Sequence, residues 1–364
     1  MISPSVAGHR AIHIDVLGVR LRLESGDGAD QVAHDWAWCR SEPPDGEVVA
    51  VAGHSARALE TAVTKEAISQ AVGRLHLWHA AGVASADGRV LILVAPSGTG
   101  KSTAAVHLSR SGWGYVTDET VGVTLDGRVL PYPKPVAIVS SVPDGPPLAG
   151  VKHIMSPDDL GLGRPPKALV VGRIVVLDRS ETASSPTLSR MPLLEGLEAV
   201  IAQSSGLVEL PEPLLSTCRI IRRAGGVYRL SYADISTATD LLDELLLRDP
   251  EPPQQWIHRA ADVNDTDSGV PNADVVARAP WLDAIRSDGD WLVLVGSVAL
   301  RLRGLGATIW EALDHVRTEA ELVTLMRRAH GSHPDAAALV GRAIEDMAAA
   351  GVVVRTALSV VGGP

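Results

Sequence analysis

The stretch Ala95-Pro-Ser-Gly-Thr-Gly-Lys-Ser-Thr103 does most to decide the fold of this chain. It matches the Walker A pattern G-x-x-x-x-G-K-[ST], except that Ala95 replaces the first glycine. The apolar run RVLILVA leads into it, and STAAVHLSRSG leads out of it with helical spacing. This order of strand, loop and helix predicts a P-loop in an α/β domain, rather than a chance glycine-rich turn.

The residue types of this loop fit the binding of a nucleotide. Gly98 and Gly100 let the backbone curl until several N–H groups face one anion, and the positive end of the following helix points to the same place. Lys101 can reach the β and γ phosphates, and the Ser102 hydroxyl can bind magnesium. We therefore expect ATP and Mg²⁺ as cofactors. The expected binding residues are Ser97, Gly98, Thr99, Gly100, Lys101, Ser102 and Thr103.

Acidic side chains follow the loop in two places. Asp118 and Glu119 come directly after a short strand in GYVTDETVGV, where one could orient magnesium while the other accepts a proton from an attacking hydroxyl. A solvated acidic turn is the alternative. Asp178 ends the apolar strand RIVVLD and is a rival for the metal-binding carboxylate, or merely begins a turn. His79, in LHLWHAAGVA, could lie near an acid–base site or be structural.

These residues together resemble the catalytic domain of HPr kinase/phosphorylase, over roughly Gln70 to Leu247. The resemblance implies a P-loop kinase domain related to phosphoenolpyruvate carboxykinases, which phosphorylates a serine hydroxyl on a protein. By the same resemblance, Lys101 would hold the transferred phosphate and Ser102 the magnesium. Asp118 would be the base on the acceptor hydroxyl, and His79 the histidine near that base.

The chain departs from that family in two ways. The family's carboxylate pair is usually two aspartates, whereas the second residue here is Glu119. The later E-x-R-G-x-G signature, which includes a magnesium-binding glutamate, has no clear counterpart in HIMSPDDLGLGRPPKALVVGRIVVLD. The resemblance therefore implies kinase activity, and it does not extend to phosphorylase activity or to HPr as the substrate.

Around the loop, helix and strand patterns interleave. AIHIDVLGVRLRL (Ala11 to Leu23) alternates like one strand, and Ser55 is a plausible N-cap for a helix that closes near Gly73. Ser141 to Pro166 is too rich in proline and glycine for regular structure. We expect an ATP-binding domain over residues 1–248 with a β-rich part over 1–74, a linker over 249–272 and a separate domain over 273–364.

The last domain has a different plan, with strands followed by three helical stretches. LGATIWEALDHVRTEAELVTLMRRAHGSHPDAAALVGRAIEDMAAAGVVV is similar to the PqqD family. These are small winged-helix-like domains that recognise the leader peptides of ribosomally made, modified peptides (RiPP recognition elements). The resemblance implies that a leader peptide adds a strand to the sheet and packs on the third helix. Exposed sheet edges favour such binding on physical grounds. Arg301 and Arg303, on one face of SVALRLRG, would then meet an acidic or extended peptide.

Composition limits the other function classes. The 364 residues carry a net charge of −10, which argues against nucleic acid as the main partner. The two cysteines are far apart and predict neither disulfides nor a zinc cluster. No apolar run is long enough to span a membrane and no signal segment is evident, so we expect a cytoplasmic protein, which could form homo-oligomers.

The sequence thus favours an ATP-dependent kinase that phosphorylates a hydroxyl, most simply that of a serine, on a peptide or small protein. The expected substrate is the precursor of a modified peptide, which the C-terminal domain would dock and so raise in effective concentration. A non-catalytic ATP-binding chaperone that presents the precursor to another enzyme is the alternative.

Overall fold

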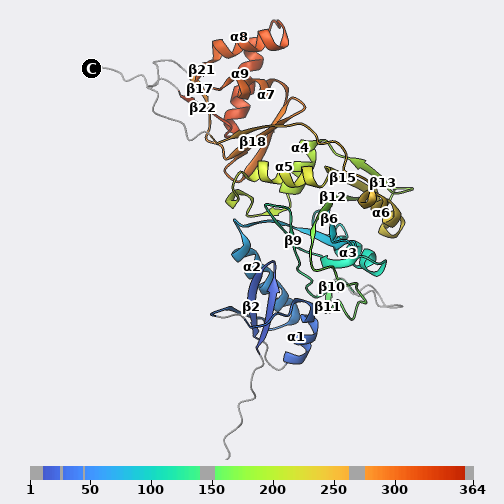
Figure 1. Cartoon of the computed structure of the whole chain (residues 1–364). Coiled ribbons are helices and arrows are strands. Elements are labelled where there is room, and N and C mark those ends of the chain that lie inside the picture. Colours follow the sequence, from blue (N-terminus) through green and yellow to red (C-terminus); the bar gives the residue numbers. More distant parts are fainter. Residues whose placement is uncertain (1–10, 25–27, 44–45, 140–151, 262–274, 357–364) are drawn as a thin grey trace, which may run out of the picture. The chain divides into compact units, whose positions relative to one another are not determined.

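The computed structural model describes residues 11–24, 28–43, 46–139, 152–261 and 275–356 (Figure 1). It is a mixed α/β structure with several sheets. The chain divides into two compact units: Met1–Leu210 with Arg219–Pro253, and Pro211–Cys218 with Gln254–Pro364. Nothing in the sequence pointed to the placement of Pro211–Cys218 in the second unit.

The first unit begins with a small sheet in the order β1-β2-β3. Strands β1 (Ile12–Val16) and β2 (Val19–Glu24) pair antiparallel, and β3 (Val49–Ala52) runs parallel to β2. The prediction of one strand over Ala11 to Leu23 was wrong. Leu17 and Gly18 have φ angles of 55° and 70°, and two consecutive residues with positive φ form the tight turn that reverses a hairpin.

Two helices accompany this sheet. Helix α1 (Ala29–Asp35) leads into the 3-10 helix η1 (Ala37–Cys39). Helix α2 (Ala56–Ala71) begins where the sequence predicts, because the Ser55 hydroxyl accepts a hydrogen bond from the Ala58 N–H at 3.2 Å. Leu59, Val63 and Ala67 of α2 are buried in the core of this part of the chain.

The main sheet has six strands in the order β13-β15-β12-β6-β5-β7. Strand β12 runs parallel to both β6 and β15, whereas β5, β7 and β13 pair antiparallel with their neighbours. The bounds are β5 (Ala80–Ala84), β6 (Arg89–Val94), β7 (Gly114–Thr117), β12 (Val170–Arg179), β13 (Thr187–Arg190) and β15 (Val227–Tyr232). The P-loop strand β6 therefore lies in the middle of the sheet.

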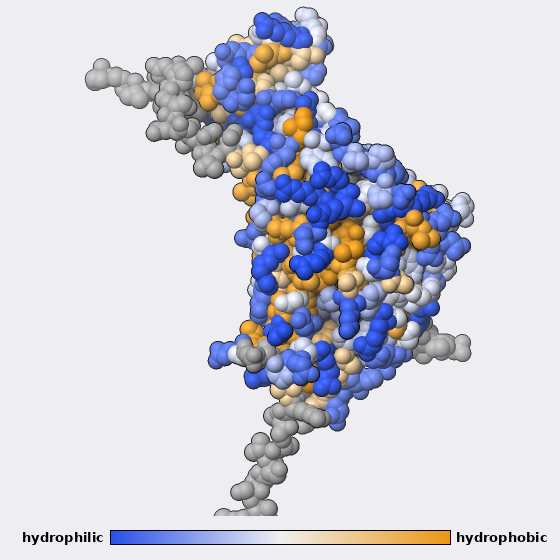
Figure 2. Space-filling view, viewed as in Figure 1, coloured by the Kyte–Doolittle hydropathy of each residue, from blue (hydrophilic) through white to orange (hydrophobic). Residues whose placement is uncertain are grey.

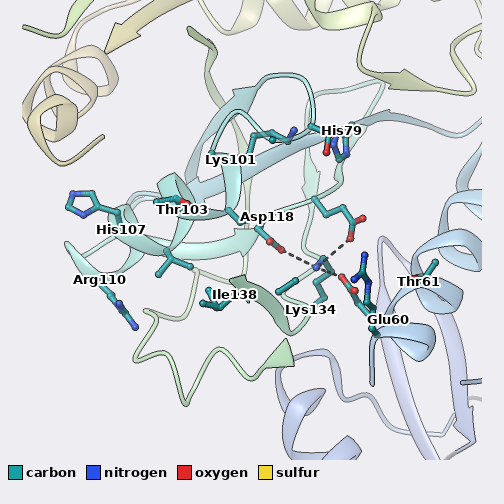
Figure 3. Close-up of a pocket in the computed structure, with 18 residues that line it drawn as sticks. Glu60, Thr61, His79, Lys101, Thr103, His107, Arg110, Asp118, Lys134 and Ile138 are labelled. Carbon is teal, nitrogen blue, oxygen red and sulfur yellow. Dashed lines mark hydrogen bonds and ion pairs between the residues drawn. The ribbon is translucent and has the colours of Figure 1, made fainter. Parts of the chain in front are cut away.

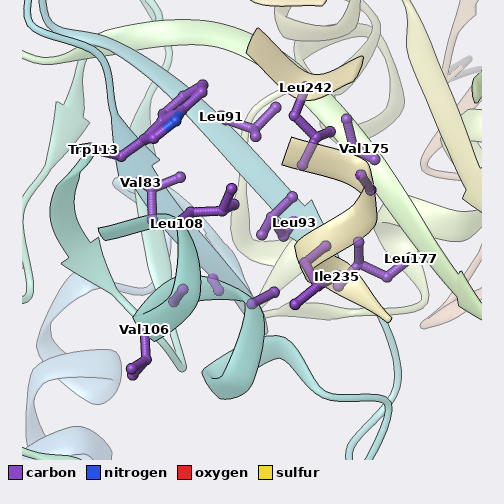
Figure 4. Close-up of a cluster of buried hydrophobic side chains, with 14 of the residues drawn as sticks. Val83, Leu91, Leu93, Val106, Leu108, Trp113, Val175, Leu177, Ile235 and Leu242 are labelled. Atoms are coloured by element: carbon purple, nitrogen blue, oxygen red, sulfur yellow. The ribbon is translucent and has the colours of Figure 1, made fainter. Parts of the chain in front are cut away.

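Helices α3 (Lys101–Arg110) and α6 (Thr239–Leu247) pack on one face of this sheet. Figure 4 shows Leu108 of α3 and Leu242 of α6 facing side chains that alternate along the strands, such as Leu91 and Leu93 of β6. Aliphatic side chains fill most of this core, and Val175 and Leu177 of β12 extend it. This packing fixes the start of α3 at the end of β6, which positions the loop between them.

Helix α4 (Leu193–Ile201) packs closely against β15, since a Cβ on Gly196 would lie 2.7 Å from Val227 Cβ. Helix α5 (Pro213–Arg223) starts in the second unit and ends in the first. The 3-10 helices η2 (Leu207–Glu209) and η3 (Ile235–Ala238) precede α5 and α6.

Two smaller sheets complete the first unit. One has the order β14-β4-β8-β9, with bounds β4 (Leu75–Trp78), β8 (Val121–Thr124), β9 (Val129–Leu130) and β14 (Ser204–Ser205). The other pairs β10 (Val136–Val139) with β11 (Lys152–Met155). Strand β11 corrects the prediction that Ser141 to Pro166 holds no regular structure. Its four residues contain neither proline nor glycine, and β10 supplies their partner.

The second unit contains two sheets and three helices within the described residues. The sheets have the orders β16-β18-β19-β20 and β21-β17-β22. Their strands are β16 (Ile257–Ala260), β17 (Val275–Arg278), β18 (Asp283–Ser287), β19 (Asp290–Val295), β20 (Val298–Leu302), β21 (Arg317–Thr318) and β22 (Val353–Thr356). The helices are α7 (Gly304–Ala312), α8 (Glu319–His330) and α9 (Ala336–Ala349), in the region for which the sequence predicts three helical stretches.

Trp291 and Trp310 lie at the centre of the second unit's core, with ring centroids 4.8 Å apart. On the face seen in Figure 2, hydrophilic residues predominate and hydrophobic residues show between them in small groups. None of the helices in the described ranges combines the length and apolar character needed to cross a bilayer.

Candidate functional site

The loop between β6 and α3 has the backbone that a phosphate-binding loop needs. Gly98 and Gly100 have φ angles of 85° and 100°, a region in which residues with a side chain are strained. A Cβ on Gly98 would meet nothing within 4 Å, so the backbone at this point is open to an incoming group. Gly100 is the N-cap of α3, whose first N–H groups therefore point toward the loop.

The Lys101 side chain lies over this loop. Its Nζ donates to the Ala95 carbonyl at 2.7 Å and to the Pro96 carbonyl at 3.0 Å. Burial lowers the pKa of Lys101 from its ordinary value, while the nearby Asp118 and Glu119 carboxylates oppose that change. The ammonium group is thus held at the loop and faces the two acidic residues that the sequence singled out.

A cavity of about 690 Å³ adjoins the loop. Figure 3 shows Lys101 and His79 on one side of it and Lys134 with Glu60 on another. The loop, α2, α3 and the segments after β7 and β9 supply its walls. The lining residues are Arg57, Glu60, Thr61, His79, Ser97, Gly98, Gly100, Lys101, Ser102, Thr103, Val106, His107, Arg110, Asp118, Glu119, Lys134, Ala137 and Ile138.

Asp118 directly follows β7 and is 4% exposed. Its Oδ1 accepts a hydrogen bond from the Tyr115 hydroxyl at 2.9 Å and lies 3.1 Å from Lys134 Nζ. Burial opposes the charged form of Asp118. The Lys134 ammonium, together with hydrogen bonds from Ser102 and Tyr115, outweighs this and holds the pKa of Asp118 below its ordinary value. Asp118 is therefore a carboxylate at neutral pH, in contact with the P-loop serine.

Glu119 is the more accessible of the two acids, with 35% of its side chain exposed. Its Oε2 atom is buried without a hydrogen-bond partner among the described residues, although Lys134 Nζ lies 3.4 Å away. An acidic oxygen with unused acceptor capacity beside the P-loop fits a magnesium ligand, since Mg²⁺ is usually held by one or two carboxylates and substrate phosphates. Within the described ranges no three His, Cys, Asp or Glu side chains form a group that could hold a metal alone.

His79 also lines the cavity, next to Lys101 (Figure 3). Burial lowers the pKa of His79, and the positive charge of Lys101 lowers it further, against the opposing effect of Glu119. The imidazole is therefore neutral at neutral pH. The structure thus brings His79, Lys101, Ser102, Asp118 and Glu119 to one cavity.

Two of the residues predicted for the nucleotide site lie outside this lining. Asp178 is the last residue but one of β12, the strand parallel to β6, but it is exposed and accepts a hydrogen bond from the Ser231 hydroxyl at 2.9 Å. Thr99 donates to the Pro96 carbonyl at 3.0 Å and does not line the cavity. Asp118 and Glu119 thus line the cavity, and Asp178 does not.

Sequence reasoning missed Lys134 and Glu60. Lys134 is 1% exposed, and its Nζ lies 2.5 Å from Glu60 Oε1, 3.1 Å from Asp118 Oδ1 and 3.4 Å from Glu119 Oε2. Burial lowers the pKa of Lys134, but the three carboxylates outweigh burial and raise it well above its ordinary value. The sequence carries one weak signal, a lysine between two prolines in a largely apolar stretch, PYPKPVAIV.

The predicted peptide-binding arginines lie in the second unit. β20 is the last strand in the order of its sheet, and Arg301 lies on it. Arg301 pairs with Asp290 at 3.0 Å, and its side chain is 19% exposed. Arg303 follows the strand, lies 3.7 Å from the same carboxylate and is 70% exposed. Asp290 therefore offsets part of the positive charge that the sequence assigned to this edge.

Comparisons with known proteins give a distant likeness among solved structures. No family model matches the chain, and no curated protein matches it. Among solved structures, it is similar to the Hpr(Ser) kinase/phosphatase from Coxiella burnetii, with 14% sequence identity and a TM-score of 0.25. That match covers 47% of this chain and 93% of the other. A likeness this distant does not establish an activity, so the function has to be inferred from the geometry of the cavity.

Proposed function

We propose that this chain is an ATP-dependent kinase that transfers a phosphoryl group to a hydroxyl, most simply a serine hydroxyl, of a peptide or small protein. One observation carries the proposal: the buried carboxylate of Asp118 lines the same cavity as Ser102 and Lys101 of the P-loop. A phosphate-binding loop alone indicates only that a phosphate binds. An ionised carboxylate beside it adds a group that can accept a proton.

The residues of the loop fit the triphosphate of ATP. The open backbone at Gly98 and the first N–H groups of α3 would bind phosphate oxygens, and Lys101 would exchange its loop carbonyls for the transferred phosphate. Ser102 and Glu119 would hold Mg²⁺. Bound MgATP supplies the phosphoryl group and the metal charge that stabilises the phosphate oxygens during transfer.

The chain's own residues then have to orient the acceptor and remove the proton of its hydroxyl. The acceptor oxygen forms a bond to the γ phosphorus, the bond from that phosphorus to the β-phosphate oxygen breaks, and the hydroxyl proton goes to the Asp118 carboxylate. Asp118 lies within hydrogen-bond reach of fixed donors, so its orientation is set before the acceptor arrives. Neutral His79 can donate a hydrogen bond next to Lys101 without adding charge.

The second unit would dock the acceptor peptide. Its sheet ends at β20, where an extended peptide could add a strand, and Arg303 lies exposed beside that edge. These features support the PqqD-like interpretation, in which the docked segment is the leader of a precursor peptide. Docking would raise the concentration of the acceptor at the cavity in the first unit without adding contacts there.

Incubation with γ-labelled ATP and a candidate precursor peptide tests the proposal. We expect stable transfer of label to the peptide, and none to a matched peptide whose serines are replaced by alanine. Saturable ATP binding without transfer to any peptide would instead support the chaperone that presents its precursor to another enzyme.

A further inference from the structure

Lys134 is the most deeply buried charged residue of the cavity wall, at 1% exposure. Its three N–H groups have partners: Glu60 at 2.5 Å, Asp118 at 3.1 Å and the Pro135 carbonyl at 3.2 Å. Burying an ammonium group is costly unless such partners surround it, and a hydrophobic residue at this position would commonly be as stable or more so. The lysine therefore calls for an explanation other than stability.

Asp118 is held by donors from three parts of the chain. Ser102 lies on α3, Tyr115 on β7, and Lys134 on the segment between β9 and β10. Ser102 belongs to the P-loop and would exchange partners when magnesium binds. Tyr115 and Lys134 would then be the donors that still fix the carboxylate. Lys134 alone among these donors also contacts Glu119.

The lysine is in turn fixed from the other side by helix α2. Glu60 accepts its hydrogen bond, and Leu59 and Val63 on the same helix are buried in a separate core. One turn after Glu60, Thr64 bonds the Tyr132 hydroxyl at 2.7 Å, so the segment that carries Lys134 contacts α2 twice. The dashed lines in Figure 3 follow this path from Asp118 through Lys134 to Glu60.

We propose that Lys134, anchored by Glu60, is a positioning residue that holds Asp118 and Glu119 in the orientation needed for phosphoryl transfer. This inference rests on the proposed function. The ammonium does not have to touch the nucleotide or the acceptor. It acts as a fixed cation between α2 and the two acids at the P-loop, and its loss leaves those acids free to turn or to repel each other.

The test is steady-state phosphoryl transfer by Lys134→Ala, with n-propylammonium as a probe that replaces the missing part of the side chain. We expect kcat to fall by about 10- to 100-fold and KM for ATP to change by less than about threefold, as for a group that acts only in the transition state. Propylammonium should restore much of kcat, and propanol should not. Lys65→Ala, an exposed lysine on α2, is the matched control and should leave kcat unchanged.

Two outcomes would overturn the inference: a kcat within about twofold of wild type, or equal rescue by propanol and propylammonium. If Lys134→Ala does not fold, the double variant Glu60→Gln/Lys134→Met takes its place, because it removes both charges of the pair. A folded double variant that transfers slowly supports positioning, and one that transfers at the wild-type rate overturns it.

A urea unfolding cycle separates this inference from the proposed function, since it needs no acceptor. Lys134→Met and Asp118→Asn should shift the unfolding midpoint non-additively, because each removes the other's partner. Additive shifts would show that the pair does not form. If the cycle shows this coupling but the wild-type chain transfers no phosphate, the kinase proposal is contradicted. The contact between Lys134 and Asp118 would still be supported.

Discussion

Asp118 in the first unit and Asp283 in the second are both almost completely buried, and they differ in what surrounds them. Asp283 is 0% exposed and accepts hydrogen bonds from the backbone N–H groups of Leu214, Leu215 and Ala284 at 2.8 to 3.0 Å. His258 Nε2 lies 2.7 Å from it. Asp118, by contrast, is held by side-chain donors, and it lines the cavity.

This difference separates a structural carboxylate from one suited to chemistry. Backbone donors are fixed by the fold, so Asp283 can do little except cap the start of α5 and join it to β18. Side-chain donors can exchange partners, and a cavity gives a ligand access to the carboxylate. Burial alone would therefore not identify the candidate base, whereas burial together with side-chain donors and a cavity does.

The largest effect should come from Lys101→Ala. Loss of the ammonium at the loop removes the charge that would follow the transferred phosphate, and such electrostatic contributions are worth roughly 3 to 4 kcal/mol. We expect transfer of label from ATP to fall by at least about 100-fold, with unfolding of the second unit unchanged. Transfer above about a tenth of the wild-type rate would contradict the assignment of this loop as the phosphate site.

Asp283→Ala tests the structural role of the buried carboxylate in the second unit. It leaves three backbone N–H groups and His258 without their shared acceptor, and each unsatisfied buried donor costs about 1 to 3 kcal/mol. We expect the unfolding free energy of the second unit to fall by at least about 3 kcal/mol, as measured by calorimetry, while ATP affinity is retained.

Asp335→Ala is the matched control for that measurement. Asp335 is the N-cap residue of α9, but it makes no side-chain capping bond and is exposed. Equal destabilisation by the two alanines would show that the buried hydrogen bonds of Asp283 do not set the stability of this unit.

Asp118→Asn tests the chemical role directly. The amide keeps the size and part of the hydrogen bonding of the carboxylate, but it cannot accept a proton from the acceptor. We expect transfer to fall by roughly 100-fold, a typical general-base contribution, and nucleotide affinity to stay within a few-fold. Asp178→Asn, outside the cavity, is the control. If Asp178 proved essential and Asp118 dispensable, the metal carboxylate would be Asp178, near the end of β12.

The parts of this site that the sequence could predict are those encoded in a few consecutive residues. The loop from Ser97 to Ser102 can be predicted from the local spacing of glycine and lysine. The helix after Ser55 can be predicted from a capping residue followed by apolar residues at helical spacing. The turn at Leu17 and Gly18 was missed although the alternation changes phase there, with buried apolar residues at 12, 14 and 16 before the turn and at 19, 21 and 23 after it.

The contacts between distant residues could not be predicted in this way. Glu60 and Lys134 are 74 positions apart, and neither segment indicates the other as its partner. Asp283 likewise meets Leu214 across 69 positions. No local pattern encodes such a contact, because the burial that makes it strong exists only after the separate elements have packed.

The smallest effect concerns the edge of the second unit, where Arg303 is exposed and Arg301 is paired with Asp290. Arg303→Glu should weaken binding of an acidic precursor peptide by about two- to fivefold and make it less sensitive to salt, as expected for one exposed charge. Arg301→Glu should also place two acids side by side at Asp290, so its effect on binding must be compared with its effect on unfolding. Titration of the full-length wild type and of each variant with the peptide, at two salt concentrations, measures the change in affinity. If Arg303→Glu binds as wild type does at both, the peptide does not meet this edge through charge, and the docking role would rest on the β20 backbone alone.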